Sequence, residues 1–583
     1  MNVSDKIKQL HGNDEAQLEF IFSDNRRIIV ESPAGYGKTK VMISKIAYLI
    51  ASGKLPNPKK ILALTFSVNA SYKIKKEVVQ ELPNLLDESL NKEVYDKIQV
   101  SNYHGLCRRI LKRYGFRLSS YLRNVDTLIT FNDGDTREYK RLSVVLNSEK
   151  QSFLAQFNSE VKNCNSEFVK TNFNRYNEIV QDDLLRQKVI PFNSLITLTV
   201  KLLKEYPRIK LFYQSYFKSI FIDEFQDTNL LSYGLIKYLI DENTYVYLLG
   251  DSLQRIYGFI GAIPNVLQKA KVDFQMEFIT LSKNYRFKDN PEMLQLDNNI
   301  RANALNPISP LIDSPVSLKF SHLDNQELEG EYLISQCKDL LSNNDTDKIS
   351  ILFRSRGFNT NIVITQFDDS GLPYFYALFS DEEADYKKYH FDAAKLFIEY
   401  LGKGKFSKRL CSKFYKELVG QTDSNNPTHN SLNVLLNIFL KQLFIENYHM
   451  EEEDKIILVK ETFEGLGLKQ YIEFVDSRII LTTIHGAKGL EWEYVIIPDM
   501  EQNSLPSYFS CRDCGFKSNC DYTYNELNQD KLLDELSVFY VAFTRARKQV
   551  YFSASKKSYS PNGDREFKNN LSCFLSLDGI TLP

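Results

Sequence analysis

Short apolar runs, each followed by a turn and then by a polar stretch of helical period, dominate the first half of this chain. They read RIIVE at 27–31, ILALTF at 61–66, IFID at 220–223 and YVYLL at 245–249. Continuously apolar runs are typical of strands buried in a parallel sheet, and the amphipathic stretches between them are typical of crossover helices. We therefore expect an α/β domain built on a mostly parallel sheet.

A second series of the same kind follows later. It reads ISILF at 349–353, IILTT at 479–483, YVIIP at 494–498 and QVYFS at 549–553, which predicts a second α/β domain. Segments without strand signals, rich in Leu, Phe, Lys and Glu at helical spacing, interrupt both series and predict a mainly helical insertion in each domain. The expected domains are 1–116 with 191–275, its insertion 117–190, then 276–380 with 475–583, and its insertion 381–474.

Composition excludes several classes of protein. The apolar runs are too short to cross a bilayer, and the N-terminal MNVSDKIKQL lacks the apolar core of a secretory signal. Eight cysteines in 583 residues do not resemble a disulfide scaffold, so we expect a cytoplasmic protein with reduced thiols and no membrane partner. The net charge of −1 gives no global basic field, so a nucleic-acid contact would need a local groove. The basic clusters at 73–76 and 108–113 are equally well explained as solvated helix faces.

A glycine-rich segment, SPAGYGKT, lies between the first apolar run and a helical stretch at 41–51. Phosphate binding requires inward-pointing backbone N–H groups, a helix N-terminus, a lysine for the phosphate oxygens and a hydroxyl for Mg²⁺. Serine stands where such a loop usually has its first glycine. The predicted phosphate-binding residues are Ser32, Pro33, Ala34, Gly35, Tyr36, Gly37, Lys38 and Thr39.

Two adjacent carboxylates follow the run at 220–223, in the string IDEFQDT. Hydrolysis of a nucleoside triphosphate needs one carboxylate to hold Mg²⁺ and another to take a proton from the attacking water. We assign these roles to Asp223, with Thr39, and to Glu224. An isolated Asp-Glu pair is most often a surface pair, so the prediction depends on the whole string.

Several motifs together resemble those of the UvrD/Rep-like superfamily 1 DNA helicases. They are TFSVNA, FIDEFQDTN, LGDSLQRIYGFIGA, KNYR, TTIHGAKGLEW and DELSVFYVAFTRAR, and they occur in the family's order over roughly residues 10 to 555. The resemblance implies two RecA-like domains that bind ATP and Mg²⁺. It also implies an ATP-dependent helicase that moves along single-stranded DNA from 3′ to 5′ and acts on partly duplex DNA.

The resemblance further implies roles for single residues around the nucleotide. Gln17 matches the glutamine that reads adenine, while Lys40 and Tyr285 match the positions that sandwich the base, with lysine where arginine is frequent. The catalytic set adds Gln254 as a sensor of the γ-phosphate, and Arg286 and Arg545 as the arginines that reach it from the second domain. Glu491 matches the residue that faces the ribose.

For the DNA path, Phe66, Tyr257 and Phe259 match positions whose aromatic rings stack on bases, with phenylalanine at 259 in place of the usual tryptophan. His104 and His485 match positions near the strand. Core packing is the alternative explanation for any one of these rings, since the chain has 34 Tyr and 39 Phe.

Three cysteines, Cys511, Cys514 and Cys520, have C-x2-C-x5-C spacing, which suits a structural zinc ion or an iron–sulfur cluster. A fourth ligand is missing nearby. Cys573, Cys411, Asp513 and Asp521 are open candidates, and three reduced thiols are the alternative.

Two departures from the family leave the biological role open. The insertion at 381–474 is short, which predicts unwinding that is weak or depends on a partner. The stretch after the last motif is too short for a fused nuclease domain, so cutting would belong to a separate nuclease subunit. The alternatives are a translocase subunit of a nuclease-containing repair or phage-defence complex, and a nucleotide-gated DNA-binding switch without processive movement.

Overall fold

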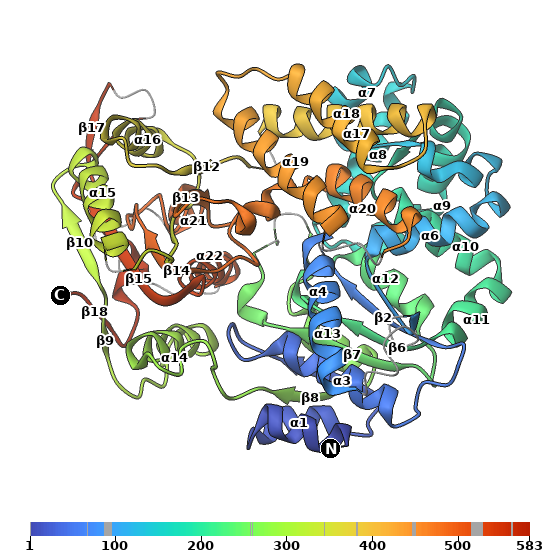
Figure 1. Cartoon of the computed structure of the whole chain (residues 1–583), viewed down its shortest axis with the longest axis horizontal. Coiled ribbons are helices and arrows are strands. Elements are labelled where there is room, and N and C mark those ends of the chain that lie inside the picture. The colour runs from blue at the N-terminus through green and yellow to red at the C-terminus, as the bar shows by residue number, and fades with distance from the viewer. Residues whose placement is uncertain are drawn as a thin grey trace.

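Two six-stranded parallel sheets organise the chain in the computed structural model (Figure 1). The expected α/β class with two parallel sheets is confirmed. The structure describes residues 2–66, 68–86, 96–256, 258, 261–342, 344–380, 383–445, 450–514, 529–560 and 564–583. No described helix is long and apolar enough to span a membrane.

The first sheet has the strand order β3-β2-β6-β7-β1-β8, and every pair in it is parallel. Its central strands are made of apolar residues that helices cover on both faces, so Ile28, Ile29 and Val30 are fully buried. The strands are β1 (Arg27–Glu31), β2 (Lys60–Thr65), β3 (Ile98–Asn102), β6 (Phe217–Ile222), β7 (Tyr245–Gly250) and β8 (Glu277–Thr280). Its helices are α1 (Val3–His11), α2 (Glu15–Phe22), α3 (Lys38–Ala51), α4 (Val68–Leu85), α6 (Tyr103–Tyr114), α10 (Ser194–Glu205), α11 (Pro207–Tyr216), α12 (Leu230–Leu239) and α13 (Val266–Asp273).

The second sheet has the order β10-β15-β14-β11-β13-β12, again with parallel pairs throughout. Its strands are β10 (Phe320–Leu323), β11 (Ile349–Phe353), β12 (Phe375–Ala377), β13 (Ile479–Thr483), β14 (Trp492–Ile497) and β15 (Ala546–Ser555). Its helices are α14 (Pro291–Leu305), α15 (Gln326–Ser342), α16 (Phe358–Ser370), α21 (Tyr508–Asp513) and α22 (Gln529–Phe543). Short strand pairs join β9 (Val316–Ser317) to β18 (Ile580–Thr581) and β16 (Lys557–Tyr559) to β17 (Glu566–Lys568).

Between β3 and β6 the chain leaves the first sheet, and between β12 and β13 it leaves the second. The first excursion holds α7 (Thr136–Arg141), α8 (Ser148–Lys162) and α9 (Ser166–Ile179). It also holds a two-stranded sheet, β4 (Ile129–Phe131) with β5 (Val189–Pro191), which the sequence pattern does not indicate. The second excursion is helical, with α17 (Ala384–Lys403), α18 (Lys408–Gly420), α19 (Pro427–Ile445) and α20 (Glu452–Glu464).

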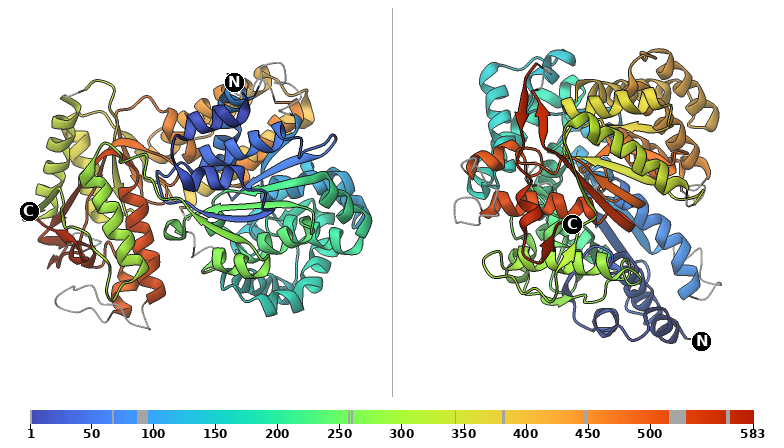
Figure 2. Two further views of the ribbon diagram at one scale, coloured as in Figure 1. Left: turned by 90° about the horizontal axis from the view of Figure 1, so that it is seen from below. Right: turned by 90° about the vertical axis from the view of Figure 1, so that its left-hand side faces the viewer.

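The two excursions pack against each other and against α6, which the views in Figures 1 and 2 show from three sides. Arg108 of α6 is buried and pairs with Glu464 at 2.5 Å, and Arg109 pairs with Asp454 at 2.8 Å. The Arg141 guanidinium lies 3.5 Å from the ring centroid of Phe391. Ion pairs therefore hold the second helical excursion against α6, and a cation–π contact joins it to the first.

Candidate active site

The SPAGYGKT segment forms the turn between β1 and α3. Gly35 and Gly37 both have φ of +83°, a left-handed conformation that strains any residue with a Cβ atom. At Gly35 a Cβ would also lie 2.6 Å from the Cβ of Arg286. Helix α3 begins at Lys38, three residues before the expected start, and Gly37 supplies no side-chain cap. The first backbone N–H groups of α3 are thus available to a phosphate.

Both predicted carboxylates lie at the carboxyl end of β6, facing the lysine of this loop. Lys38 Nζ is 3.2 Å from Asp223 Oδ1 and also pairs with Glu224. Gln226 donates a hydrogen bond of 2.5 Å to Glu224. Burial raises the pKa of Glu224, but the ammonium groups of Lys38 and Lys488 outweigh it and lower that pKa to about 2. Glu224 is therefore ionised at neutral pH, as a proton acceptor must be.

The donor set fits a phosphate chain with a hard cation. Asp223 supplies a buried carboxylate and Thr39 a hydroxyl at the start of α3. Three buried oxygens at this edge of the sheet have no hydrogen-bond partner among the described residues, namely Ser32 Oγ, Thr65 Oγ1 and Asp227 Oδ1. Buried polar atoms left without partners are expected where a polar ligand binds. Carboxylate and hydroxyl oxygens are the ligands that Mg²⁺ prefers, so these residues fit Mg²⁺ with a nucleotide.

Residues predicted to hold the base gather at the other end of the loop. The Gln17 amide donates to the carbonyl of Tyr36 at 3.0 Å, and its oxygen lies 2.5 Å from His11 Nδ1. The backbone N–H of Tyr285 bonds the carbonyl of Gly35 at 2.8 Å, and its hydroxyl bonds Asp14 at 2.7 Å. Tyr285 remains 40% exposed, so a planar ligand can reach it. Lys40 is an exposed residue of α3 whose ammonium bonds the carbonyl of Leu10 at 3.3 Å.

Two arginines reach this site from the side of the second sheet. Arg286 pairs with Glu491 and donates to the carbonyl of Thr544. Arg545 is buried and donates to Gln254 at 3.5 Å. Burial and the neighbouring Arg286 lower the pKa of Arg545 to about 10, which leaves it charged at neutral pH. Gln254 in turn bonds Asp251 at 2.9 Å.

Sequence reasoning missed two basic residues that connect the two sheets. Lys488 Nζ lies 2.6 Å from Asp227 and 3.0 Å from the carbonyl of Gln254. Arg301 lies 3.1 Å from Asp251. Lys488 lies inside the motif TTIHGAKGLEW, and this motif could have identified it. Arg301 lies outside the motifs, so no sequence pattern marks it. In each of these two ion pairs, a basic side chain from the unit of the second sheet pairs with a carboxylate from the unit of the first sheet.

The residues predicted for the DNA path are more dispersed. Phe66 is half-buried directly after β2, and His485 follows β13. His104 on α6 stacks on Phe192 with ring centroids 3.7 Å apart. Burial lowers the pKa of both histidines to about 3, so both are neutral. Tyr257 and Phe259 lie outside the described residues.

Of the three-cysteine motif, Cys511 and Cys514 lie in and just after α21, whereas Cys520 is outside the described residues. Cys511 is buried, and its Sγ accepts a hydrogen bond from Asn503 N at 3.2 Å. Of the candidates for a fourth ligand, Cys573 is buried after β17 and Cys411 packs within α18, while Asp521 lies outside the described residues.

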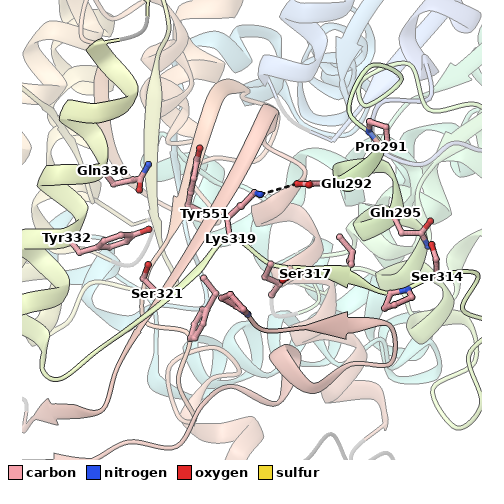
Figure 3. Close-up of a pocket in the computed structure, with 15 residues that line it drawn as sticks. Pro291, Glu292, Gln295, Ser314, Ser317, Lys319, Ser321, Tyr332, Gln336 and Tyr551 are labelled. Atoms are coloured by element: carbon pink, nitrogen blue, oxygen red, sulfur yellow. Dashed lines mark ion pairs between the residues drawn. The ribbon is translucent and has the colours of Figure 1, made fainter.

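A cavity of 720 Å³ lies away from these residues, between α14, α15 and the edge of the second sheet (Figure 3). Lys319 and Glu292 form an ion pair of 3.4 Å across it. None of the predicted site residues lines this cavity. The residues predicted to bind the nucleotide therefore lie at the junction of the two sheets and not at the cavity.

A phosphate-binding loop, a carboxylate pair at the end of another strand of the same sheet and basic residues from a second parallel sheet define a P-loop nucleoside triphosphatase with its site between two α/β units. Residues 13–275 match the UvrD/REP helicase N-terminal domain, and residues 395–557 match the UvrD-like helicase C-terminal domain. The chain belongs to the UvrD/REP helicase family, which confirms the resemblance drawn from its motifs.

Individual relatives are similar in sequence to most of this chain. The protein named ATP-dependent DNA helicase PcrA from Bacillus subtilis is 25% identical over 94% of this chain and 83% of its own length. The PcrA of Staphylococcus epidermidis is 24% identical over 92% of this chain and 82% of its own length. A Mycoplasma genitalium protein named "Probable DNA helicase II homolog" is 25% identical over 93% of this chain and 84% of its own length.

Proposed function

We propose that this protein is an ATP-dependent DNA helicase that moves along single-stranded DNA from 3′ to 5′. The observation that carries the proposal is the division of the ATP site between two parallel sheets, with Lys38, Asp223 and Glu224 on one side and Arg286, Arg545 and Lys488 on the other. A site divided in this way links hydrolysis to the relative position of the two units. The names of the relatives supply the substrate, DNA.

Each residue at the junction has a part in hydrolysis. Lys38 turns from Glu224 to the phosphate oxygens. Asp223 with Thr39 would hold Mg²⁺, and that ion would neutralise phosphate charge. Glu224, released from its ion pair, accepts a proton from the attacking water. Arg286 leaves Glu491 for the γ-phosphate, where Arg545 and Gln254 also act. Gln17, Tyr285 and Lys40 hold the adenine, and Glu491 faces the ribose.

The ion pairs across the junction couple this chemistry to movement. Lys488 bonds Asp227 and the backbone carbonyl of Gln254. A movement of Gln254 in response to the γ-phosphate is therefore transmitted to the unit of the second sheet. The strand of DNA then lies against Phe66, Tyr257 and Phe259, because a motor that accepts every sequence must hold bases by their faces. His104 and His485 are assigned to the walls of this path.

The domain boundaries complete the proposal. The ATP-binding domain comprises 1–116 and 191–275 with the insertion 117–190, and the second RecA-like domain comprises 276–380 and 475–583 with the insertion 381–474. Any DNA cleavage that accompanies this motor is assigned to a separate nuclease subunit, since the catalytic residues named above serve ATP hydrolysis. We also propose a cytoplasmic location, which is compatible with a DNA substrate.

The proposal is tested by the rate of ATP hydrolysis with and without single-stranded DNA. We expect saturating oligonucleotide to raise the rate at least about tenfold, since closing the junction completes the site. Lys38→Ala should abolish the stimulated rate, and Lys319→Ala, beside the remote cavity, should leave it unchanged. An ATPase rate that single-stranded DNA does not alter contradicts the proposal.

We further propose a structural zinc ion or iron–sulfur cluster at Cys511, Cys514 and Cys520, supported by their C-x2-C-x5-C spacing. Elemental analysis of anaerobically purified protein should find about one zinc ion, or the iron of one cluster, per chain. Replacement of all three cysteines by serine should remove that metal and lower stability before it lowers basal ATPase activity. Less than about 0.2 zinc or iron per folded chain excludes this metal.

A further inference from the structure

Three buried carboxylates meet at the carboxyl edge of the second sheet, outside the ATP site. Glu329 comes from α15, and Asp499 and Glu501 come from the loop that follows β14. One oxygen from each lies within 4.8 Å of the others. Their exposed fractions are 0%, 8% and 4%, so water does not screen their mutual repulsion.

The fold holds these carboxylates together with backbone and hydroxyl donors. Asp499 adopts φ of +60°, and its backbone N–H donates to Glu329 at 3.2 Å. Ser553 Oγ donates to the same Glu329 oxygen at 2.6 Å, and Ser555 Oγ donates to Glu501 at 3.0 Å. Because these bonds go to one oxygen of each glutamate, the arrangement orders the carboxylates without neutralising them.

In the described part of the chain, no lysine, arginine or histidine forms an ion pair with any of the three. Other buried carboxylates of this protein have such a partner: Asp227 pairs with Lys488, and Asp251 pairs with Arg301. Isolated buried negative charges are strongly unfavourable unless a proton or a cation compensates them.

An unpartnered amide oxygen supplies an independent indication of a ligand. Asn359, at the start of α16, is 7% exposed, and its Oδ1 has no hydrogen-bond partner among the residues that the structure describes. Its Nδ2 contacts Asp499 and lies 3.4 Å from Glu329. Rotation of the amide by half a turn exchanges these two atoms and directs Oδ1 at the carboxylates. That orientation is favourable when a cation lies between Oδ1 and the carboxylates, or when one of the carboxyls is protonated and donates to Oδ1.

We propose that Glu329, Asp499, Glu501 and Asn359 form a binding site for one divalent cation, with Ca²⁺ the best-matched ion. Ca²⁺ accepts six to eight oxygen ligands from carboxylates and amide carbonyls in flexible geometry. Mg²⁺ usually keeps several waters, for which this enclosed site offers little space. The ion connects α15, α16 and the loop after β14, so it stabilises the second α/β unit independently of the nucleotide.

The test uses full-length wild-type protein without nucleotide. After treatment with chelator and dialysis, metal content is measured by elemental analysis, and thermal unfolding is followed with and without CaCl2. We expect about one Ca²⁺ per chain after reloading and a rise in Tm of at least about 3 °C, because the ion binds only the folded state. MgCl2 at the same concentration should raise Tm less.

Two variants separate this site from the ATP site. Glu501→Gln should lose the Ca²⁺-dependent rise in Tm, whereas Asp223→Asn, which removes the carboxylate assigned to Mg²⁺ with ATP, should keep it. Wild-type protein that binds less than about 0.2 Ca²⁺ and unfolds at the same temperature with and without it overturns the proposal, and protons then compensate the cluster. An equal rise in Tm for Glu501→Gln and wild type also overturns it.

Discussion

Replacing Glu224 with glutamine is expected to lower the rate of DNA-stimulated ATP hydrolysis by about 10²- to 10⁴-fold and to leave ATP binding within a few-fold of wild type. The carboxylate faces the phosphate-binding loop, is ionised, and is oriented by Gln226. Glutamine keeps the size of the side chain and removes the proton acceptor. Single-turnover hydrolysis and equilibrium binding of a fluorescent ATP analogue separate the two effects.

A matched control is Glu242→Gln, which makes the same chemical change at an exposed position before β7. It should hydrolyse ATP at the wild-type rate. Lys38→Ala should differ in kind from Glu224→Gln, since it loses nucleotide affinity as well as turnover. A Glu224→Gln protein that hydrolyses ATP within threefold of the wild-type rate would remove this residue from the role of general base.

Replacing Arg286 with alanine is expected to lower the hydrolysis rate by about 10³-fold, the usual effect of losing an arginine that contacts the transferred phosphate. Arg286 projects from the second α/β unit, and its side chain is only 12% exposed. Its partner Glu491 lies at the same junction, so the guanidinium can exchange this carboxylate for the γ-phosphate. The measurement is steady-state ATP hydrolysis at saturating single-stranded DNA.

Arg547→Ala is the control, because Arg547 pairs with the same Glu491 but its side chain is 56% exposed. Exposed ion pairs contribute little, so this variant should keep its rate within a few-fold of wild type. Equal losses in the two variants would show that the Glu491 pairings are structural and that Arg286 has no special part in hydrolysis.

The sequence predicts the parts of the fold that follow from local pattern. All eight expected strands are present, because each is a continuous apolar run buried on both faces. Four further strands of the two six-stranded sheets are missed: β3, β8, β10 and β12. Those strands lie at the sheet edges and are three to five residues long. β3, β8 and β10 carry polar or half-exposed residues, and buried β12 has only three residues, so the apolar pattern of all four is weak.

The site is predictable where chemistry requires adjacent residues and not where the chain brings distant ones together. The SPAGYGKT loop and the Asp223–Glu224 pair are visible in one short window each. By contrast, the contact of Arg301 with Asp251 and the cluster of Glu329 with Asp499 depend on tertiary packing. No spacing in the sequence marks either one.

The most direct measurement of the proposed movement is ATP-dependent displacement of streptavidin from biotinylated single-stranded oligonucleotides. A motor that moves from 3′ to 5′ pushes streptavidin from the 5′ end, so 5′-biotin oligonucleotide should lose it much faster than 3′-biotin oligonucleotide. The reaction should require hydrolysable ATP and fail with Glu224→Gln. Continued DNA-stimulated hydrolysis without displacement from either end, or faster displacement from the 3′ end, would contradict directed 3′ to 5′ translocation.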